Sequence, residues 1–184
     1  MLNGNKVRIR SLEREDLPKV WQWLNDGDVM YYWASPGSMV SMAELERHFS
    51  KSLETADTRR WFIIEGEGQR PIGLMMCFNL DQRHRRAEVG ILIGEKDCWD
   101  KGYGTEAMVL FLDYLFNELG LHRVYLHTQD YNLRAIKSYE KCGFVKEGVV
   151  RERYFVKGKY HDGFLMSILS HEFSQRFETR LGGQ

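Results

Sequence analysis

The chain has 184 residues, of which 43% are hydrophobic and 28% are charged, and its 26 basic side chains are balanced by 26 acidic ones. This composition is typical of one globular domain with a sizeable core, and it excludes an intrinsically disordered chain. Formal neutrality also removes the simplest argument for nucleic acid or a membrane surface as a partner, because both favour strongly basic proteins.

The first elements predicted along the chain are one strand and two helices. Residues Lys6–Arg10 alternate between apolar and charged side chains, which predicts a strand. Apolar residues recur at helical spacing over Asp16–Asn25 and predict an amphipathic helix. A second helix is expected over Met42–Leu53, with Ser41 as its N-terminal cap.

The central segment predicts a hairpin followed by a strand, a buried helix and another strand. The hairpin joins Trp61–Glu65 to Ile72–Asn79 across a turn-rich stretch, and the next strand covers Ala87–Ile93. Residues Thr105–Glu118 are apolar nearly all round, so this helix is expected to be buried on several sides. The strand after it is predicted over Val124–Thr128.

A helix and two strands are expected to close the chain. The helix covers Asn132–Cys142 and ends at Gly143, and the two strands flank Lys157–Lys159. Strands that come first and then alternate with helices imply a mixed α/β sheet with helices on both of its faces.

Cysteine usage and apolar runs bear on the compartment. Cys77, Cys98 and Cys142 are odd in number and widely spaced, so they indicate free thiols in a reducing cytoplasm and no metal site. No apolar run approaches the ~18 residues of a membrane span, and Met1–Arg10 carries no signal-peptide pattern. We therefore expect a cytoplasmic protein that forms one domain over residues 1–184.

One glycine-containing segment has the features of an anion cradle. Lys101-Gly102-Tyr103-Gly104-Thr105 follows a predicted strand and opens the next predicted helix. Two glycines spaced by one residue let backbone N–H groups turn inward, and a helix N-terminus favours a phosphate. A tight turn that binds nothing accounts for the same spacing equally well, because short Gly-x-Gly matches are common.

A second segment places two polar side chains on one helical face. Asn132 and Tyr139 are separated by two helical turns, which brings them to nearly the same side of the predicted helix. Asn132 is a good helix cap, and a tyrosine hydroxyl in a site can donate a proton to a thiolate. A core tyrosine with a satisfied hydroxyl is the alternative interpretation.

Together these segments resemble a known family. The stretches Glu88–Ile93, Trp99–Ala107 and Asn132–Phe144 are similar to the GNAT superfamily of acetyl-CoA-dependent N-acetyltransferases, and the likeness spans essentially the whole chain. Within the superfamily, the chain most resembles the branch of ribosomal-protein N-terminal and spermidine acetyltransferases. One departure is Trp99, which stands where the phosphate loop of the family commonly begins with Gln or Arg. The resemblance implies a central twisted sheet of about seven strands flanked by about four helices.

The resemblance also implies a site for acetyl-CoA and no metal. A main-chain N–H near Leu92 or Ile93 would polarise the thioester carbonyl. Arg134 is either a partner of a CoA phosphate or a solvated charge on its helix. The pantetheine arm is expected where one strand separates from Val124–Thr128, along the edge formed by Ile91, Leu92 and Ile93. On the helix, Asn132 is expected to contact the pantetheine. The pyrophosphate is expected to bind backbone amides of the loop, which belong to Asp100, Lys101, Gly102, Tyr103, Gly104 and Thr105.

The same resemblance implies an acid and a base. Tyr139 is expected to protonate the departing CoA thiolate. The acceptor amine must lose a proton before it attacks, and Glu88 is the preferred base because it begins the strand on which the thioester lies. A salt bridge with Arg85 or Arg86 is the alternative role of Glu88. The weaker candidates for the base, which fit structural roles better, are His127 and His122.

The acceptor is expected to meet the first two helices, the loop between them and the final strand pair. Aromatic rings in that loop lie close in sequence to Asp26 and Asp28, and rings with carboxylates suit a cation. A hydrophobic plug between the helices is the alternative, above all for Trp33. Residues 34–37 lack the acidic side chains that spermidine acetyltransferases tend to carry there, which argues against a polyamine. The side chains expected to bind the acceptor are Tyr31, Tyr32, Trp33 and Glu88.

The leading hypothesis is an N-acetyltransferase in which a primary amine directly attacks acetyl-CoA within a ternary complex. The amine belongs to a protein N-terminus, a polyamine or another small cation, and a homodimer is the family-level expectation. A non-catalytic module that binds acetyl-CoA as a sensor is the alternative. Local charge suits a cationic acceptor and an anionic donor, because residues 11–57 hold nine acidic side chains against four basic ones, whereas residues 130–162 hold eight basic against five acidic.

Overall fold

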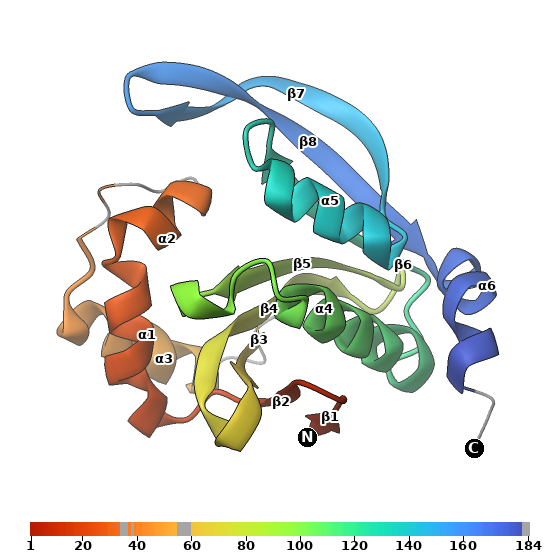
Figure 1. Ribbon diagram of the computed structural model, residues 1–184, viewed down its shortest axis with the longest axis horizontal. Coiled ribbons are helices and arrows are strands. Elements are labelled where there is room, and N and C mark those ends of the chain that lie inside the picture. Colours follow the sequence, from red (N-terminus) through yellow and green to blue (C-terminus); the bar gives the residue numbers. More distant parts are fainter. Residues whose placement is uncertain (34–36, 38, 55–59, 182–184) are drawn as a thin grey trace.

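The computed structural model describes residues 1–33, 37, 39–54 and 60–181, which form a mixed sheet of eight strands with helices on both faces (Figure 1). The strands are β1 Leu2–Asn3, β2 Arg8–Ser11, β3 Arg60–Glu65, β4 Pro71–Asp81, β5 Arg86–Ile93, β6 Arg123–Gln129, β7 Val145–Val156 and β8 Lys159–Leu169. Their order across the sheet is β1-β2-β3-β4-β5-β6-β8-β7, and every neighbouring pair is antiparallel except β5 and β6. The expected mixed α/β class is confirmed.

The part of the chain that the structure describes holds one strand and two α-helices more than predicted. Its helices are α1 Leu17–Leu24, α2 Gly27–Tyr32, α3 Met42–Glu54, α4 Tyr103–Asp113, α5 Leu133–Cys142 and α6 Ser170–Leu181, with a π-helical turn over Tyr114–Glu118 extending α4. The sequence patterns do not predict β1, α2 or α6. β1 has two residues and α2 has six, so neither is long enough for a period to show. α6 is anchored by Phe173 and Phe177, one turn apart and both buried.

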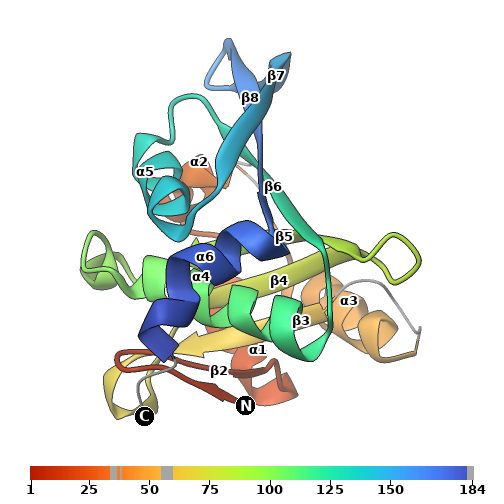
Figure 2. The ribbon, with the colours of Figure 1, turned by 90° about the vertical axis from the view of Figure 1, so that its right-hand side faces the viewer.

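Alternation along β3 and β4 divides the core between the two faces of the sheet. Ile64 and Met75 belong to a cluster that includes residues of α4 and α6, whereas Ile63, Leu74 and Met76 belong to a second cluster with α1, α2 and α3. Neighbouring side chains of a strand point to opposite faces, which explains the division. Figure 2 shows α4 and α6 on one side of these strands, with α1 and α3 on the other. The central strands are therefore covered on both sides and form a rigid platform.

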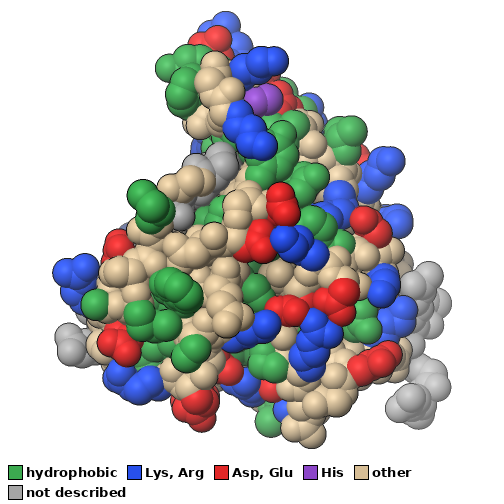
Figure 3. Space-filling view, turned by 60° about the vertical axis from the view of Figure 1, so that its left-hand side comes forward, with side chains coloured by type: hydrophobic (Ala, Val, Ile, Leu, Met, Phe, Trp, Pro, Cys, Tyr) green, Lys and Arg blue, Asp and Glu red, His purple; other side chains and the backbone are tan. Residues whose placement is uncertain are grey.

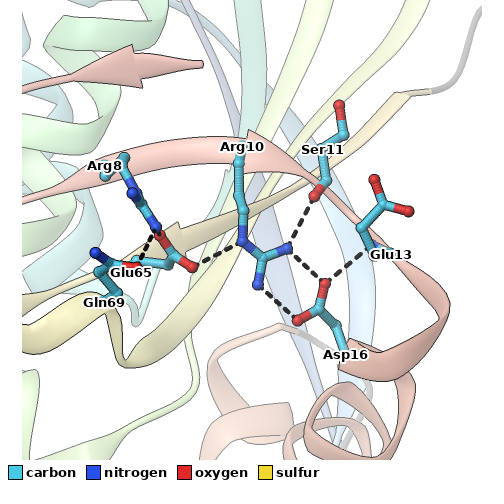
Figure 4. Close-up of polar contacts among 7 residues, drawn as sticks. All are labelled: Arg8, Arg10, Ser11, Glu13, Asp16, Glu65 and Gln69. Carbon is cyan, nitrogen blue, oxygen red and sulfur yellow. Dashed lines mark hydrogen bonds and ion pairs between the residues drawn. The ribbon is translucent and has the colours of Figure 1, made fainter.

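A buried ion network fixes the start of α1 against the sheet (Figure 4). The Arg10 guanidinium donates two hydrogen bonds of 2.7 Å to the Asp16 carboxylate and one of 2.7 Å to Glu65. Asp16 also accepts from the main-chain N–H of Glu13, and Glu65 pairs with Arg8. Asp16 and Glu65 are 5% and 3% exposed, so both carboxylates are paired where water scarcely reaches them. Burial raises the pKa of Asp16, but the hydrogen bonds from Arg10 and Glu13 lower that pKa overall.

Candidate active site

The sheet opens where its parallel pair ends. β5 pairs with β6 only over Arg86, Ala87 and Glu88, and beyond this point both strands continue without pairing to each other. The space between the two strands is a cleft of about 590 Å³, which is lined by β5, β6, the loop before α4, and parts of α2, α5 and β7. Along Val89–Ile93, the edge of β5 that faces β6 therefore presents its backbone groups to a cleft instead of a strand.

The loop from β5 leads to a helix N-terminus that no side chain caps. Gly102 precedes α4 with φ = 86°, a left-handed conformation that favours glycine, and Asp100 has φ = 60°. The first N–H groups of α4 lack helical partners, and the positive end of the helix dipole adds to them. This end of the cleft can therefore bind an anion such as a pyrophosphate. Of the six predicted loop residues, four line the cleft, and Lys101 and Tyr103 do not: the four are Asp100, Gly102, Gly104 and Thr105.

Hydrogen bonds and ion pairs anchor this loop to α1 and to the residue before β4. Glu95 accepts a hydrogen bond of 2.8 Å from Trp23 Nε1 and pairs with Lys19 at 2.7 Å and with Arg70. Burial raises the pKa of Glu95, but the hydrogen bonds from Lys19, Trp23 and Arg70 lower it overall. The carboxylate thus stays ionised and ties the start of the loop to two other parts of the chain.

The carboxylates expected beside the acceptor have a different role. Lys96 pairs with both Asp26 and Asp28, each at 2.9 Å. Asp26 also caps α2 by accepting from the main-chain N–H groups of Asp28 and Val29, and its pKa is lowered, chiefly by Lys96. The two acidic groups are neutralised locally and hold α2 to the loop before α4. Figure 3 shows acidic and basic side chains lying next to each other on this side of the molecule.

Arg134 contacts two aromatic rings that meet edge-on. Its guanidinium carbon is 3.9 Å from the ring centroid of Trp99 and 4.7 Å from that of Tyr32. Trp99 is fixed in turn, because its Nε1 donates to the Ile93 carbonyl at 2.8 Å. Each cation–π contact of this kind contributes about 0.5–2 kcal/mol. Arg134 is therefore not the freely solvated charge of the alternative interpretation, and the stack joins α2, the loop and α5 beside the cleft.

Asn132 and Tyr139 lie on the side of α5 that faces the cleft. Asn132 caps α5, as predicted, by accepting from the Ala135 N–H at 3.2 Å, and its amide donates to the Tyr32 carbonyl at 3.2 Å. Tyr139 is 7% exposed, and its hydroxyl forms no hydrogen bond with the described residues. Burial raises the pKa of this phenol, so it is protonated throughout the physiological range.

Glu88 lies where β5 and β6 separate, and its carboxylate contacts two neighbours. Oε1 is 3.0 Å from Nδ1 of His127, and Oε2 accepts from Nδ2 of Asn79 at 2.9 Å. The side chains of Glu88 and His127 are 23% and 19% exposed, and both line the cleft. The alternative prediction, a salt bridge of Glu88 with Arg85 or Arg86, is wrong. Arg85 donates to the Gly120 carbonyl, and Arg86 pairs with Asp81.

The three aromatic residues after Asp28 do not form an open loop. Tyr31 and Tyr32 belong to α2, and Tyr31 packs against Tyr131 outside the cleft lining, with ring centroids 4.9 Å apart. Tyr32 and Trp33 do line the cleft. Trp33 abuts β5 at Gly90, where a Cβ would fall 2.9 Å from its ring. The structure thus favours the plug for Trp33, and residues 34–36 lie outside the described residues.

Two cleft residues come from β7, one of the final strand pair expected to meet the acceptor, although the sequence patterns do not identify either residue. Arg153 and Tyr154 follow a shift in the β7–β8 register between Val150 and Tyr154. Arg153 lies across Gly163 of β8, where a Cβ would come within 2.5 Å of its Cδ. A register shift re-aims side chains without leaving a periodic pattern. The one available signal is Gly163 itself, because glycine inside a strand often marks close contact.

Reactive thiols and metal clusters are not found among the described residues. The three cysteines are free and buried, and burial raises the pKa of Cys77 to about 11 and that of Cys142 to about 12. In the same part of the chain, no three His, Cys, Asp or Glu side chains gather closely enough to hold a metal ion. Nor is any helix there long and apolar enough to span a membrane.

The chain is similar to known proteins in sequence and in structure. A family model described as an acetyltransferase (GNAT) domain matches residues 6–145. The spermidine N(1)-acetyltransferase of Vibrio cholerae is 34% identical over 175 residues, which cover 95% of this chain and 99% of that protein. The spermidine N(1)-acetyltransferase of Escherichia coli strain K12 is 34% identical over 179 residues, with coverage of 97% and 94%. A crystal structure of the Vibrio cholerae spermidine N-acetyltransferase in complex with CoA and spermine matches with a TM-score of 0.85, covering 92% of this chain and 99% of that chain at 34% identity.

Proposed function

The chain belongs to the GNAT family of acetyltransferases and is an acetyl-CoA-dependent N-acetyltransferase of primary amines, and we propose that its acceptor is a polyamine such as spermidine. Relatives that match nearly the whole chain are spermidine N-acetyltransferases. The sequence argument against a polyamine rests on residues 34–37 alone, whereas the likeness to the Vibrio cholerae enzyme covers 95% of the chain. The broader likeness therefore supports a polyamine as the acceptor.

The observation that carries the proposal is the cleft between β5 and β6. It combines an uncapped helix N-terminus, a strand edge without a partner and a buried phenol in one space. In our proposal the pyrophosphate of acetyl-CoA binds the backbone amides of residues 100–105. The pantetheine binds the β5 edge over Ile91–Ile93, next to Asn132. A main-chain N–H near Leu92 or Ile93 then polarises the thioester carbonyl.

Tyr139 is proposed as the acid that protonates the CoA thiolate. Burial raises the pKa of the phenol, which alone would make it a weaker proton donor. The thiolate, however, forms in the same buried surroundings, and burial there raises its proton affinity as well. Because burial raises both pKa values, proton transfer from the phenol to the thiolate remains energetically feasible, and the phenol keeps its proton until the thiolate forms.

The acceptor side is proposed to lie at the other end of the cleft. The carboxylate of Glu88 supplies the negative charge that attracts the ammonium group of the acceptor and promotes loss of its proton. Tyr32 and Trp33 form part of the cleft lining that contacts the acceptor. Arg134, held by its contacts with Tyr32 and Trp99, is proposed to bind a CoA phosphate from the donor side. No step of this scheme uses a metal ion, so chelation with EDTA should leave the rate unchanged.

Release of the CoA thiol tests the proposed function. The panel comprises spermidine, spermine, an aminoglycoside and a peptide with a free N-terminus, and mass spectrometry identifies each product. We expect the highest kcat/KM for spermidine. Binding of acetyl-CoA in calorimetry without thiol release on any amine would instead identify a non-catalytic sensor. A preference for the peptide would move the acceptor to a protein N-terminus.

The proposal also concerns the state of the protein in the cell. It places one N-acetyltransferase domain over residues 1–184 in the cytoplasm, where the three free cysteines would stay reduced. A homodimer is included on family grounds, and light scattering on the purified protein measures it.

A further inference from the structure

We propose that His127 removes the proton from the acceptor amine and that Glu88 acts through it as a positioning residue. This inference rests on the proposed function, because it assigns the base of that reaction. The sequence favours Glu88 as the base and a structural role for His127. The contact that β5 and β6 create between the two side chains favours the opposite assignment.

Donors already occupy both oxygens of Glu88. His127 Nδ1 lies 3.0 Å from Oε1, and Asn79 Nδ2 donates to Oε2 at 2.9 Å. Each oxygen keeps a second acceptor position, but an amine that delivered its proton to Glu88 would share that oxygen with His127 or Asn79. Glu88 is therefore better placed to hold a neighbouring side chain than to receive a proton itself.

The contact with Glu88 determines which nitrogen of His127 is available. An ionised carboxylate can only accept, so Nδ1 carries the hydrogen and Nε2 carries the lone pair. Nε2 forms no hydrogen bond with the described residues, and the ring lines the cleft with 19% of the side chain exposed. Nε2 is thus a free proton acceptor in the space where the amine must approach the thioester.

The proposed step moves one proton. An N–H bond of the substrate ammonium breaks, and its proton forms a bond to Nε2, which gives a neutral amine and an imidazolium. The amine lone pair then attacks the thioester carbon, the C–S bond breaks, and the departing thiolate takes the proton of Tyr139. The nitrogen loses its second proton as the amide forms, which restores the phenol through solvent, and the imidazolium returns its own proton to solvent. The Glu88 carboxylate faces Nδ1 throughout and stabilises the positive ring, as a carboxylate does in other carboxylate–histidine pairs.

Other titratable and charged groups adjoin this pair. The Tyr125 ring on β6 is edge-on to His127, with centroids 6.2 Å apart. The titratable and charged groups that line the same cleft from other elements are Tyr32, Cys98, Asp100, Arg134, Lys137, Tyr139, Lys141, Arg153 and Tyr154. Two of this set are carboxylates with Glu88 counted, and Glu88 is the one in contact with His127, whereas the four cations oppose a positive ring.

The pH dependence of spermidine acetylation tests the assignment. His127→Gln should lower kcat/KM at neutral pH by about 10²- to 10⁴-fold, and its rate should then rise with pH toward the pKa of the substrate amine, about 10.4, because only the free amine can attack. Glu88→Gln should keep the shape of the wild-type pH profile but lower kcat, because the ring loses the carboxylate that positions it. The control is His122→Gln, in an exposed residue just before the same strand and outside the cleft, and it should change neither rate nor profile. Calorimetry should give all three variants the acetyl-CoA affinity of the wild type.

A weakly basic acceptor that is unprotonated at neutral pH separates loss of the base from damage to the fold. His127→Gln should acetylate this amine nearly as fast as the wild type, since no proton has to be removed first. The assignment is overturned if His127→Gln keeps the wild-type pH profile and most of its rate while Glu88→Gln loses both, because Glu88 would then be the base. If the wild-type protein acetylates no amine, the proposed function fails and this assignment fails with it.

Discussion

The substitution Gly104→Ala distinguishes the two interpretations of the loop before α4, an anion cradle and a turn that binds nothing. Gly104 is the second residue of α4, and its φ is not positive. A Cβ added there would lie 3.5 Å from Cγ1 of Ile93 and 3.8 Å from Cδ1 of Ile91, both ordinary contact distances. The free protein can therefore accept alanine at this position without strain.

Stability and donor binding should move in opposite directions in this variant. Alanine is better than glycine inside a helix by about 0.5–1 kcal/mol, so the free energy of unfolding should be equal or higher. The new methyl group enters the cleft between the helix N-terminus and β5, where the pyrophosphate is proposed to bind. One lost hydrogen bond to a charged group costs about 1.5–3 kcal/mol, which corresponds to a rise in Kd of about 10- to 150-fold.

Urea unfolding and calorimetry with acetyl-CoA measure the two effects on the same samples. Gly102→Ala is the matched control, because a Cβ there meets nothing within 4 Å but has to adopt φ = 86°. The control should lose about 1–2 kcal/mol of stability from backbone strain. If Gly104→Ala binds acetyl-CoA as tightly as the wild type does, the amides of this turn do not hold the pyrophosphate.

Three further outcomes test the acid and the buried ion network. Tyr139→Phe should lower kcat by about 10²- to 10⁴-fold without changing the Kd for acetyl-CoA, and an unchanged kcat would exclude Tyr139 as the acid. Asp16→Ala breaks the buried pair with Arg10 and should lower the free energy of unfolding by about 3 kcal/mol. Asp97→Ala, which breaks the exposed two-bond pair with Arg70, should lower it far less, and equal losses in urea would contradict the argument from burial. The pKa of Asp16 is lower in the folded state than in the unfolded chain, so its contribution to the free energy of unfolding is complete above about pH 4 and is lost as the pH falls through the folded-state pKa. The free energies of unfolding of wild type and Asp16→Ala, measured over a pH series, should therefore converge in acid.

Elements with long patterns could be predicted from the sequence, and short ones could not. The apolar run Thr105–Glu118 corresponds to α4 and its π-helical extension, because a period repeated over several turns leaves a clear signal. α2 has six residues, which is less than two helical turns, so no helical repeat is visible and the sequence around its aromatic residues reads as a loop. A signal did exist in Asp26, which caps α2, but a lone capping residue is too common to define a helix.

The part of the cleft that is proposed to hold the donor could be predicted from the sequence because its residues are close along the chain. Gly102 and Gly104 lie in one loop, and Asn132 and Tyr139 lie on one helix. The acceptor half depends on contacts between distant segments. The pair of Glu88 with His127 joins two strands 39 positions apart, and nothing in either local pattern indicates it. Sheet register and ion pairing are set by the whole fold, and a single segment carries no record of them.

The separation of β5 from β6 also bears on how long the protein survives in a cell. Three residue pairs connect these strands, so few backbone hydrogen bonds join the two parts of the sheet across this boundary. A ligand that binds only the folded chain stabilises it by RT ln(1 + [L]/Kd), and acetyl-CoA would do so at this sparsely paired boundary. Limited proteolysis at two acetyl-CoA concentrations measures this, and equal half-lives would contradict it. Turnover of the enzyme is then linked to the carbon supply that provides its donor, and starvation itself would promote its removal.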